Sequence, residues 1–166
     1  MKKVEAEAKK LVEILAKGGL HVSFAESCTG GLAAAMITSV PGASEVFDGS
    51  AVTYANRIKE KLLGVSGVTL REYGAVSPQC AREMARGAMA LTDADIGVSL
   101  TGIAGPDGGS EEKPVGTVFL GVATRAGTSV RRLSLDGCRD EIRRSAALEA
   151  IREATHAAQL FKSEDR

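Results

Sequence analysis

The feature that most constrains the fold of this sequence is its alternation of short apolar runs with longer helical patterns. The short runs occupy residues 21–25, 50–55 and 96–100 and have the length of buried strands. The helical patterns lie at residues 4–17, 30–40, 56–63 and 77–91. Strands that are separated by helices favour parallel pairing, because a parallel connection needs a long crossover. We therefore expect a parallel sheet core that is covered by helices.

The last third of the chain changes this pattern. Two further strands are predicted at residues 116–124 and 129–135, and Ala126-Gly127 between them indicates a hairpin. A long helix is predicted from Asp140 to about Leu160. The hairpin adds an antiparallel strand to the parallel core. The expected fold is a single domain, residues 1–166, built as a three-layer α/β/α sandwich with a mixed, mostly parallel sheet of about five strands.

Composition argues against several classes of partner. The 166 residues carry 21 basic and 21 acidic side chains, so net charge gives no general attraction to nucleic acid or to membrane surfaces. Four Phe and two Tyr are too few for a base-stacking platform, and no apolar run approaches the roughly 20 residues of a membrane span. Three widely spaced cysteines favour a reducing setting, and two histidines are too few for a histidine-rich metal site. We expect a cytoplasmic protein without nucleic-acid or membrane partners.

The heptapeptide AESCTGG, residues 25–31, lies between a predicted strand and a predicted helix, where sites gather in open α/β sheets. Ser27 on such a turn has the setting of a nucleophile elbow, and the backbone amides of Cys28 to Gly30 could stabilise an oxyanion. Cys28 is a rival nucleophile, because a helix N-terminus lowers the pKa of a thiol. The alternative is a capping loop, in which Ser27 or Thr29 begins the helix and Cys28 is a buried structural residue.

The stretch VTYANRIK, residues 52–59, follows the second predicted strand. It places Tyr54 at the strand end and Lys59 in the first turns of a helix that Asn56 is expected to cap. A serine nucleophile needs a base, and a buried lysine that loses its proton can act as one. The alternatives are a solvated surface Lys59 and a core Tyr54 whose hydroxyl reaches a partner.

A loop rich in glycine and proline runs from Thr101 to Pro114, after the third predicted strand. Such a loop can present backbone amides and hydroxyls to a phosphate, although this one does not match the P-loop pattern. The alternative is a long surface connection. A loop of this length inside a compact domain is more often functional, so we expect it to contribute to a site.

The segment GCRDEIRRS opens the last predicted helix with Arg139, Arg143 and Arg144. Two or more of these arginines could converge on an anionic ligand. Alternatively, Asp140 and Glu141 pair with Arg143 and Arg144 on the helix surface.

Five stretches of the sequence together resemble the C-terminal domain of the CinA family, the competence/damage-inducible proteins. They are AESCTGG (25–31), VTYANRIK (52–59), GAVS (74–77), TGIAGPDGGSEEKPVGTV (101–118) and GCRDEIRRSA (137–146). The resemblance implies a three-layer α/β/α fold with a mixed sheet. Two-domain members of the family carry a separate N-terminal molybdopterin-binding-like domain, which we expect to be absent here. Stand-alone members are nicotinamide-nucleotide amidohydrolases, so the resemblance implies a stand-alone deamidase.

The implied reaction is the hydrolysis of nicotinamide mononucleotide to nicotinate mononucleotide and ammonia, without a metal or other cofactor. The resemblance implies Ser27 as the nucleophile, Lys59 as its base and Tyr54 as their support. It also implies Arg139 and Arg143 near the phosphate. The other residues that it would place at the substrate are Glu26, Cys28, Thr29, Gly30, Gly31, Thr101, Gly102, Gly105, Asp107, Gly108, Gly109 and Ser110.

Three alternatives remain open at this point. Lys59 could instead activate water directly, with Ser27 only orienting the amide. The domain could also be a non-catalytic nucleotide-binding or regulatory module linked to competence or the DNA damage response, or an interaction domain whose loops contact protein. An enzyme of this size is expected to form a homodimer.

Overall fold

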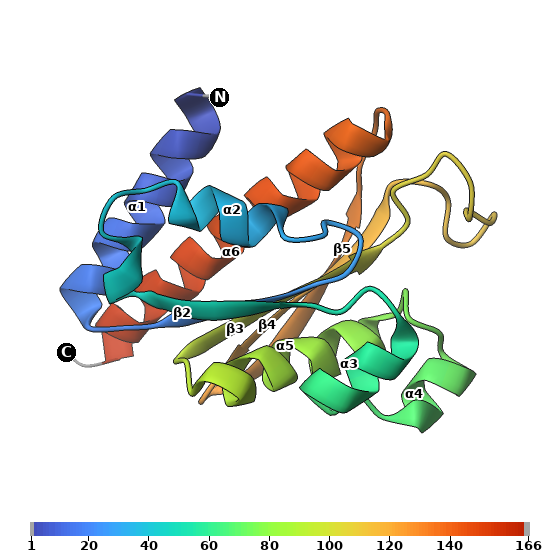
Figure 1. Ribbon diagram of the computed structural model, residues 1–166, viewed down its shortest axis with the longest axis horizontal. Coiled ribbons are helices and arrows are strands. Elements are labelled where there is room, and N and C mark those ends of the chain that lie inside the picture. The colour runs from blue at the N-terminus through green and yellow to red at the C-terminus, as the bar shows by residue number, and fades with distance from the viewer. Residues whose placement is uncertain (1, 165–166) are drawn as a thin grey trace.

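A computed structural model describes residues 2–164 of the chain and shows a five-stranded sheet between two layers of helices (Figure 1). The sheet order is β2-β1-β3-β4-β5. The strands are β1 (Val22–Glu26), β2 (Phe47–Val52), β3 (Ile96–Gly102), β4 (Thr117–Thr124) and β5 (Gly127–Ser134). β1 pairs in parallel with β2 and β3, whereas β4 pairs antiparallel with β3 and with β5, which confirms the predicted hairpin. The expected three-layer fold with a mixed sheet is confirmed.

The helices divide between the two faces of the sheet (Figure 1). One face carries α1 (Lys2–Gly18), α2 (Leu32–Thr38) and α6 (Arg139–Glu164). The other face carries α3 (Asn56–Leu63), α4 (Gly67–Glu72) and α5 (Pro78–Thr92). Because both faces are covered, β1 is buried along its whole length, and β3 and β4 are buried along all but one residue each.

Helix α5 lies directly against the sheet. A Cβ atom at Gly97 of β3 would stand 2.2 Å from the carbonyl oxygen of Ala85, and one at Gly121 of β4 would stand 2.6 Å from that of Ala81. Glycine at these two positions therefore lets the helix backbone approach the strands closely. This close packing fixes α5, against which α3 packs in turn.

The boundaries of β2 differ from the prediction. The strand begins at Phe47 rather than at residue 50 and ends at Val52. Asp48 and Gly49 in its first half disfavour a strand by residue type, yet the strand forms because it pairs with β1. Tyr54 therefore lies in the loop after β2 and not on the strand.

Four helical features also differ from the prediction. Helix α2 begins at Leu32, later than the expected residue 30. Asn56 does not cap α3: it is the first helical residue, and Ala55 occupies the N-cap position without a side-chain bond. Helix α4 and a 3₁₀ turn at Ala43–Glu45 were not predicted, because each is too short to show a helical period.

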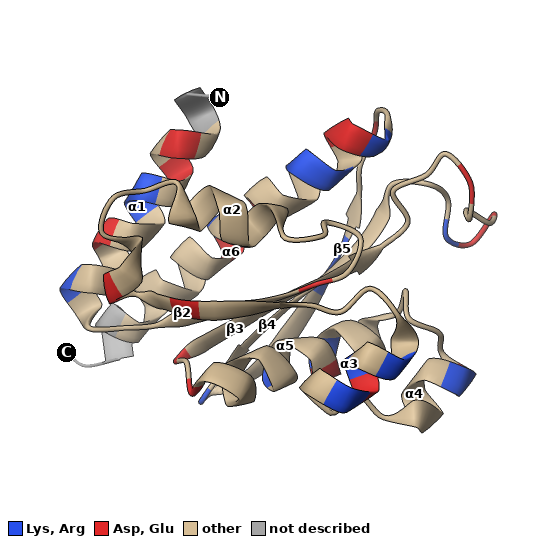
Figure 2. Ribbon diagram, viewed as in Figure 1, with Lys and Arg blue, Asp and Glu red and all other residues tan. Residues whose placement is uncertain are grey.

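Basic and acidic residues are interspersed along the helices that cover the sheet (Figure 2). Neither sign gathers on one layer in this view. No helix in the part of the chain that the structure describes combines the length and the apolar character that a membrane crossing requires.

Candidate active site

The carboxyl ends of β1, β2 and β3 meet at one edge of the sheet and place the polar motifs together. In the strand register, Glu26 pairs with Val52 on one side and with Leu100 on the other. The residues that follow these strands therefore lie side by side. The amide of Ser27 continues the ladder by donating to the carbonyl of Leu100 at 2.9 Å, and the amide of Thr53 donates to the carbonyl of Glu26 at 2.8 Å.

Lys59 reaches Ser27 from the first turns of α3. Its Nζ lies 3.0 Å from Ser27 Oγ, 2.7 Å from the carbonyl oxygen of Thr53 and 3.2 Å from that of Tyr54. Lys59 is 1% exposed. Among the described residues, no carboxylate oxygen lies within 4.0 Å of its Nζ. The buried amine is thus surrounded by neutral hydrogen-bonding groups.

Burial lowers the pKa of Lys59, because the charged ammonium loses its hydration. The thiols of Cys80 and Cys28 act in the opposite direction, but burial raises the pKa of each to about 11, so both are neutral near pH 7. In the neutral amine, the two hydrogens can serve the two backbone carbonyls. The nitrogen lone pair then faces Ser27 Oγ, which is the arrangement of a general base beside its nucleophile.

Cys28 does not have the environment of a reactive thiol. It is 6% exposed, and its pKa is raised to about 11 by burial. A helix that begins next to Cys28 would lower the pKa of its thiol, but α2 begins only at Leu32, four residues later. Burial therefore outweighs the helix, which favours Ser27 over Cys28 as the nucleophile.

The carboxylate of Glu26 caps the N-terminus of α2. Its carboxylate is fully buried and accepts hydrogen bonds from the backbone amides of Gly31, Ala33 and Ala34, at 3.0, 3.1 and 2.9 Å. These amides have no partner within the helix, so the carboxylate caps it. This contact uses the helix N-terminus for structure and leaves the turn itself for chemistry.

Most backbone amides of residues 27–31 are committed to partners. The amides of Ser27, Gly30 and Gly31 donate to the carbonyl of Leu100, the carbonyl of Ser27 and the carboxylate of Glu26. The amides of Cys28 and Thr29 donate to no backbone or side-chain acceptor of another described residue. Of the Cys28 to Gly30 amides that were expected to stabilise an oxyanion, Gly30 is therefore occupied and the other two are open.

A pocket of about 280 Å³ opens beside Ser27. Its lining consists of Ser27, Cys28, Tyr54, Gly102, Ile103, Ala104, Gly105, Asp107, Gly108 and Arg139. Arg139, the first residue of α6, spans the pocket by donating to the carbonyl of Gly105 at 2.6 Å and to the hydroxyl of Tyr54 at 3.1 Å. Tyr54 is 63% exposed, so it forms part of the pocket wall and not of the core.

Several residues that were expected at the substrate do not line this pocket. They are Glu26, Thr29, Gly30, Gly31, Thr101, Gly109, Ser110 and Arg143. Thr101 is buried and donates its hydroxyl to the carbonyl of Ala75 at 2.7 Å, which ties the GAVS stretch to the site. Ile103 and Ala104 also line the pocket. They were not predicted as site residues, although the glycine-rich loop that contains them was predicted to contribute to the site.

Arg143 contacts the turn and not the pocket. Its Nε donates to the carbonyl of Cys28 at 3.0 Å, and its Nη2 donates to the carbonyl of Thr29 at 2.9 Å. Arg144, the next residue, turns outward and pairs with Asp140 at 2.6 Å. The three arginines of the motif therefore have three different environments. Within the described residues, no group of three His, Cys, Asp or Glu side chains is placed to hold a metal ion.

Comparisons with known proteins agree with this architecture. A CinA-like protein of Geobacter sulfurreducens is 54% identical over 133 residues, which cover 80% of this chain and 32% of that protein. A CinA-like protein of Kosmotoga olearia is 50% identical over 141 residues, which cover 85% of this chain and 34% of that protein. The chain thus spans about a third of the length of these curated relatives.

Solved structures match nearly the whole chain. A competence/damage inducible protein from Agrobacterium tumefaciens superposes with a TM-score of 0.89 at 43% identity, covering 94% of this chain and 95% of that one. A competence or damage-inducible protein from Enterobacter asburiae superposes with a TM-score of 0.89 at 32% identity, covering 93% and 98%. The family model described as the CinA C-terminal domain matches residues 4–158. The chain therefore belongs to the CinA C-terminal domain family.

Proposed function

We propose that this domain hydrolyses the carboxamide of nicotinamide mononucleotide to give nicotinate mononucleotide and ammonia. The observation that carries this proposal is the buried Lys59 with its Nζ 3.0 Å from Ser27 Oγ. A lowered lysine pKa and a serine hydroxyl within hydrogen-bonding distance are what amide hydrolysis without a histidine base requires. The choice of substrate rests on the resemblance to stand-alone amidohydrolases of the family.

The reaction begins when neutral Lys59 takes the hydroxyl proton of Ser27 and Oγ attacks the carboxamide carbon. The oxyanion that forms is held by the open amides of Cys28 and Thr29. Lys59 then gives its proton to the departing amide nitrogen, which leaves as ammonia. Water attacks the acyl group next, again with Lys59 as the base, and the acid is released as Ser27 regains its proton. In the alternative course, Lys59 activates water directly and Ser27 only orients the amide.

The pocket wall suits a substrate with an anionic group. Arg139 donates to a carbonyl and to a hydroxyl, and among the described residues no carboxylate pairs with its charge. The guanidinium charge is therefore available to a phosphate that is bound in the pocket. Asp107, also in the wall, carries the opposite charge. The amide would then lie at Ser27, which lines the same pocket.

The test is to incubate the pure protein with nicotinamide mononucleotide and to follow both binding, by calorimetry, and ammonia release. We expect ammonia and nicotinate mononucleotide in equal amounts. Ser27→Ala should reduce turnover by several orders of magnitude while leaving the melting temperature unchanged. An acyl-enzyme that is trapped by acid quench and detected by mass spectrometry would separate the covalent course from direct attack by water.

Two other outcomes would overturn the proposal. Binding of the mononucleotide without ammonia release would make the domain a nucleotide-binding or regulatory module. The absence of both binding and turnover would leave an interaction domain whose loops contact protein.

A further inference from the structure

We infer that Arg143 is a positioning residue, which orients the two open amides beside Ser27 so that they can hold the oxyanion. The inference rests on the proposed function. Arg143 lies on α6, more than a hundred positions from the turn along the chain, yet its guanidinium donates to two successive backbone carbonyls there. These are the carbonyls of Cys28, at 3.0 Å, and Thr29, at 2.9 Å.

The first step of the argument concerns the amide of Thr29. The carbonyl of Cys28 and the N–H of Thr29 belong to one planar trans peptide group, so they point in opposite directions. The hydrogen bond from Arg143 Nε to the carbonyl therefore fixes the direction of the N–H. The positive guanidinium also draws electron density from this peptide group, which makes its N–H a better donor to a developing negative charge.

The second step concerns the amide of Cys28. It shares a peptide group with the carbonyl of Ser27, which accepts a hydrogen bond from the amide of Gly30 at 3.1 Å. The amide of Gly30 shares its own peptide group with the carbonyl of Thr29, which accepts from Arg143 Nη2 at 2.9 Å and, at a longer 3.4 Å, from the amide of Leu32. Both open amides are thus fixed through the far ends of rigid peptide groups, and both connections lead to one guanidinium.

The third step concerns Gly30, which makes room for this guanidinium. Its φ of +63° lies in the left-handed region, and a Cβ at this position would stand 3.2 Å from Arg143 Nη2. A side chain here would be strained and would press on the guanidinium. Gly30 of the AESCTGG motif is therefore needed for the arginine contact as well as for the bend of the chain.

The geometry separates Arg143 from Arg139. Arg139 lines the pocket, whereas Arg143 does not and directs two of its donors to backbone carbonyls. A residue that orients oxyanion donors stabilises the transition state and not the bound substrate. Its loss should therefore lower kcat and leave KM nearly unchanged.

The experiment measures kcat and KM for Arg143→Ala and Arg143→Lys on nicotinamide mononucleotide and on nicotinamide riboside, which lacks the phosphate. We expect Arg143→Ala to lower kcat by about 10²- to 10³-fold on both substrates, the range seen when an oxyanion donor is lost. Arg143→Lys should recover part of this loss, because an ammonium can still donate to a carbonyl. Arg144→Ala is the matched control and should be silent, because Arg144 pairs with Asp140 on the surface.

Two results would overturn the inference. One is a loss confined to the mononucleotide together with a raised KM, which would make Arg143 a phosphate ligand. The other is a kcat that does not change. If Arg143→Ala melts below the assay temperature, the same comparison is made with Arg143→Lys, whose kcat should still fall equally on both substrates.

A fluorophosphonate probe distinguishes failure of this inference from failure of the proposed substrate. The probe forms a bond from Ser27 Oγ to phosphorus with loss of fluoride, and its phosphoryl oxygen needs the same amides. If the wild type does not hydrolyse the mononucleotide but is labelled at Ser27, slower labelling of Arg143→Ala supports the inference without the substrate. Equal labelling rates, or no labelling of the wild type, would overturn it.

Discussion

Lys59 illustrates at the residue scale how burial can create reactivity. A lysine side chain is rarely buried without a carboxylate, because the charged ammonium loses its hydration. Here the three groups around Nζ are a hydroxyl and two carbonyls. They satisfy a neutral amine fully, whereas they compensate an ammonium only in part. The site therefore favours the form of lysine that can accept a proton from Ser27.

The first prediction concerns the pH dependence that follows from this burial. The pKa of Lys59 lies below its ordinary value of 10.5. The neutral base therefore gains population as the pH rises through this lowered pKa, and kcat/KM should rise along one limb and then level off. Lys59→Met should lose this limb and about 10²- to 10⁴-fold in rate. Lys61→Met, an exposed neighbour on α3, serves as the control. A flat profile with an active Lys59→Met would show that the lysine is not the base.

The second prediction concerns Arg139 in the pocket wall. One charge-assisted contact contributes about 1.5–3 kcal/mol, so Arg139→Ala should lower kcat/KM on nicotinamide mononucleotide by roughly 10- to 150-fold. Nicotinamide riboside should be affected little, because it has no phosphate to lose. The measurement is kcat/KM on both substrates. Equal losses on the two would show that Arg139 acts through Tyr54 or the loop carbonyl and not on the phosphate.

At the scale of elements, the unit from β1 to α2 combines two functions in one short segment. The carboxylate of Glu26, the last residue of β1, caps α2, and the turn between them carries Ser27. The cap comes from a residue five to eight positions before its partners. A conventional cap lies within one or two positions of the helix start. Helix α2 begins at Leu32 and not at the expected residue 30, because Gly30 and Gly31 both have a left-handed backbone conformation, with φ of +63° and +102°.

The third prediction concerns this cap. Glu26→Ala should lower the free energy of unfolding by roughly 2–4 kcal/mol, because three backbone amides would lose a buried charged acceptor. Glu26→Gln keeps one acceptor oxygen and should lose less. Chemical denaturation measures both, with exposed Glu45→Ala as the control. If Glu26→Ala kept its full stability but lost turnover, the carboxylate would act on the substrate instead.

The same scale shows what the sequence could and could not predict. The alternation of strands and helices was sufficient to predict the three layers. The positions of Ser27, Lys59 and Tyr54 after predicted strands were sufficient to predict that they lie at one edge of the sheet. The first half of β2, at Asp48-Gly49, was not predicted, because pairing with β1 forms it against the preference of its residue types. The six-residue α4 was not predicted, because it is too short to show a helical pattern. The contact of Arg143 with the turn depends on where α6 crosses the sheet, which no local pattern contains.

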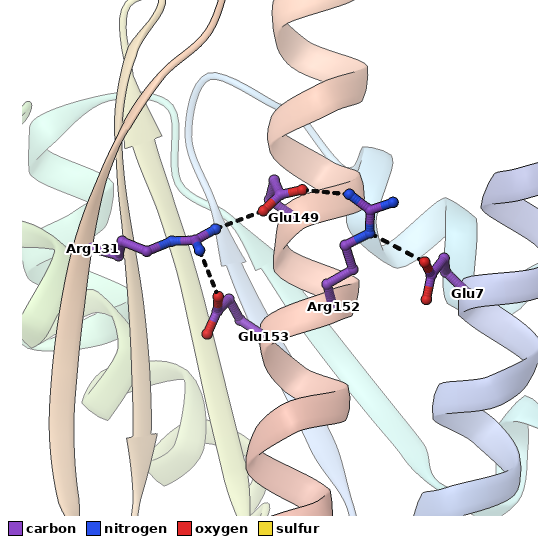
Figure 3. A network of polar contacts seen from close by, with 5 residues as sticks. All are labelled: Glu7, Arg131, Glu149, Arg152 and Glu153. Carbon is purple, nitrogen blue, oxygen red and sulfur yellow. Dashed lines mark hydrogen bonds and ion pairs between the residues drawn. The ribbon is translucent and has the colours of Figure 1, made fainter.

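At the scale of the whole molecule, a network of ion pairs joins α1, α6 and β5 (Figure 3). Arg152 on α6 contacts Glu7 on α1 at 3.2 Å and Glu149 on α6 at 2.7 Å. Arg131 on β5 contacts Glu149 at 2.6 Å and Glu153 at 3.1 Å. The helix that the network anchors also carries Arg139 and Arg143 near its N-terminus. The ion pairs therefore help to hold the layer from which both arginines reach the site.

The last prediction concerns the contribution of this network to stability and its dependence on pH. Burial by itself would raise the pKa of Glu149, but hydrogen bonds from Arg152 and Arg131 hold it below its ordinary value of 4.5. A carboxyl group whose pKa is lower in the folded state than in the unfolded state stabilises the fold at a pH above the unfolded pKa. This stabilisation disappears as the pH falls through the folded pKa. Because both partners of the Arg152 to Glu149 pair are partly exposed, Arg152→Met should lower the free energy of unfolding by only about 1 kcal/mol at pH 7.

The difference between Arg152→Met and the wild type should begin to shrink as the pH falls below the ordinary pKa of a glutamate, 4.5, and should disappear as the pH falls through the lower folded pKa of Glu149. It should also shrink in high salt, which screens exposed charges. Denaturation midpoints at pH 7 and pH 3 test the first point, with Lys9→Met as a control, since its ion pair with Glu13 is long, at 3.9 Å, and well exposed. A difference that is independent of pH would assign the effect of Arg152 to the packing of its aliphatic stem, because packing does not titrate.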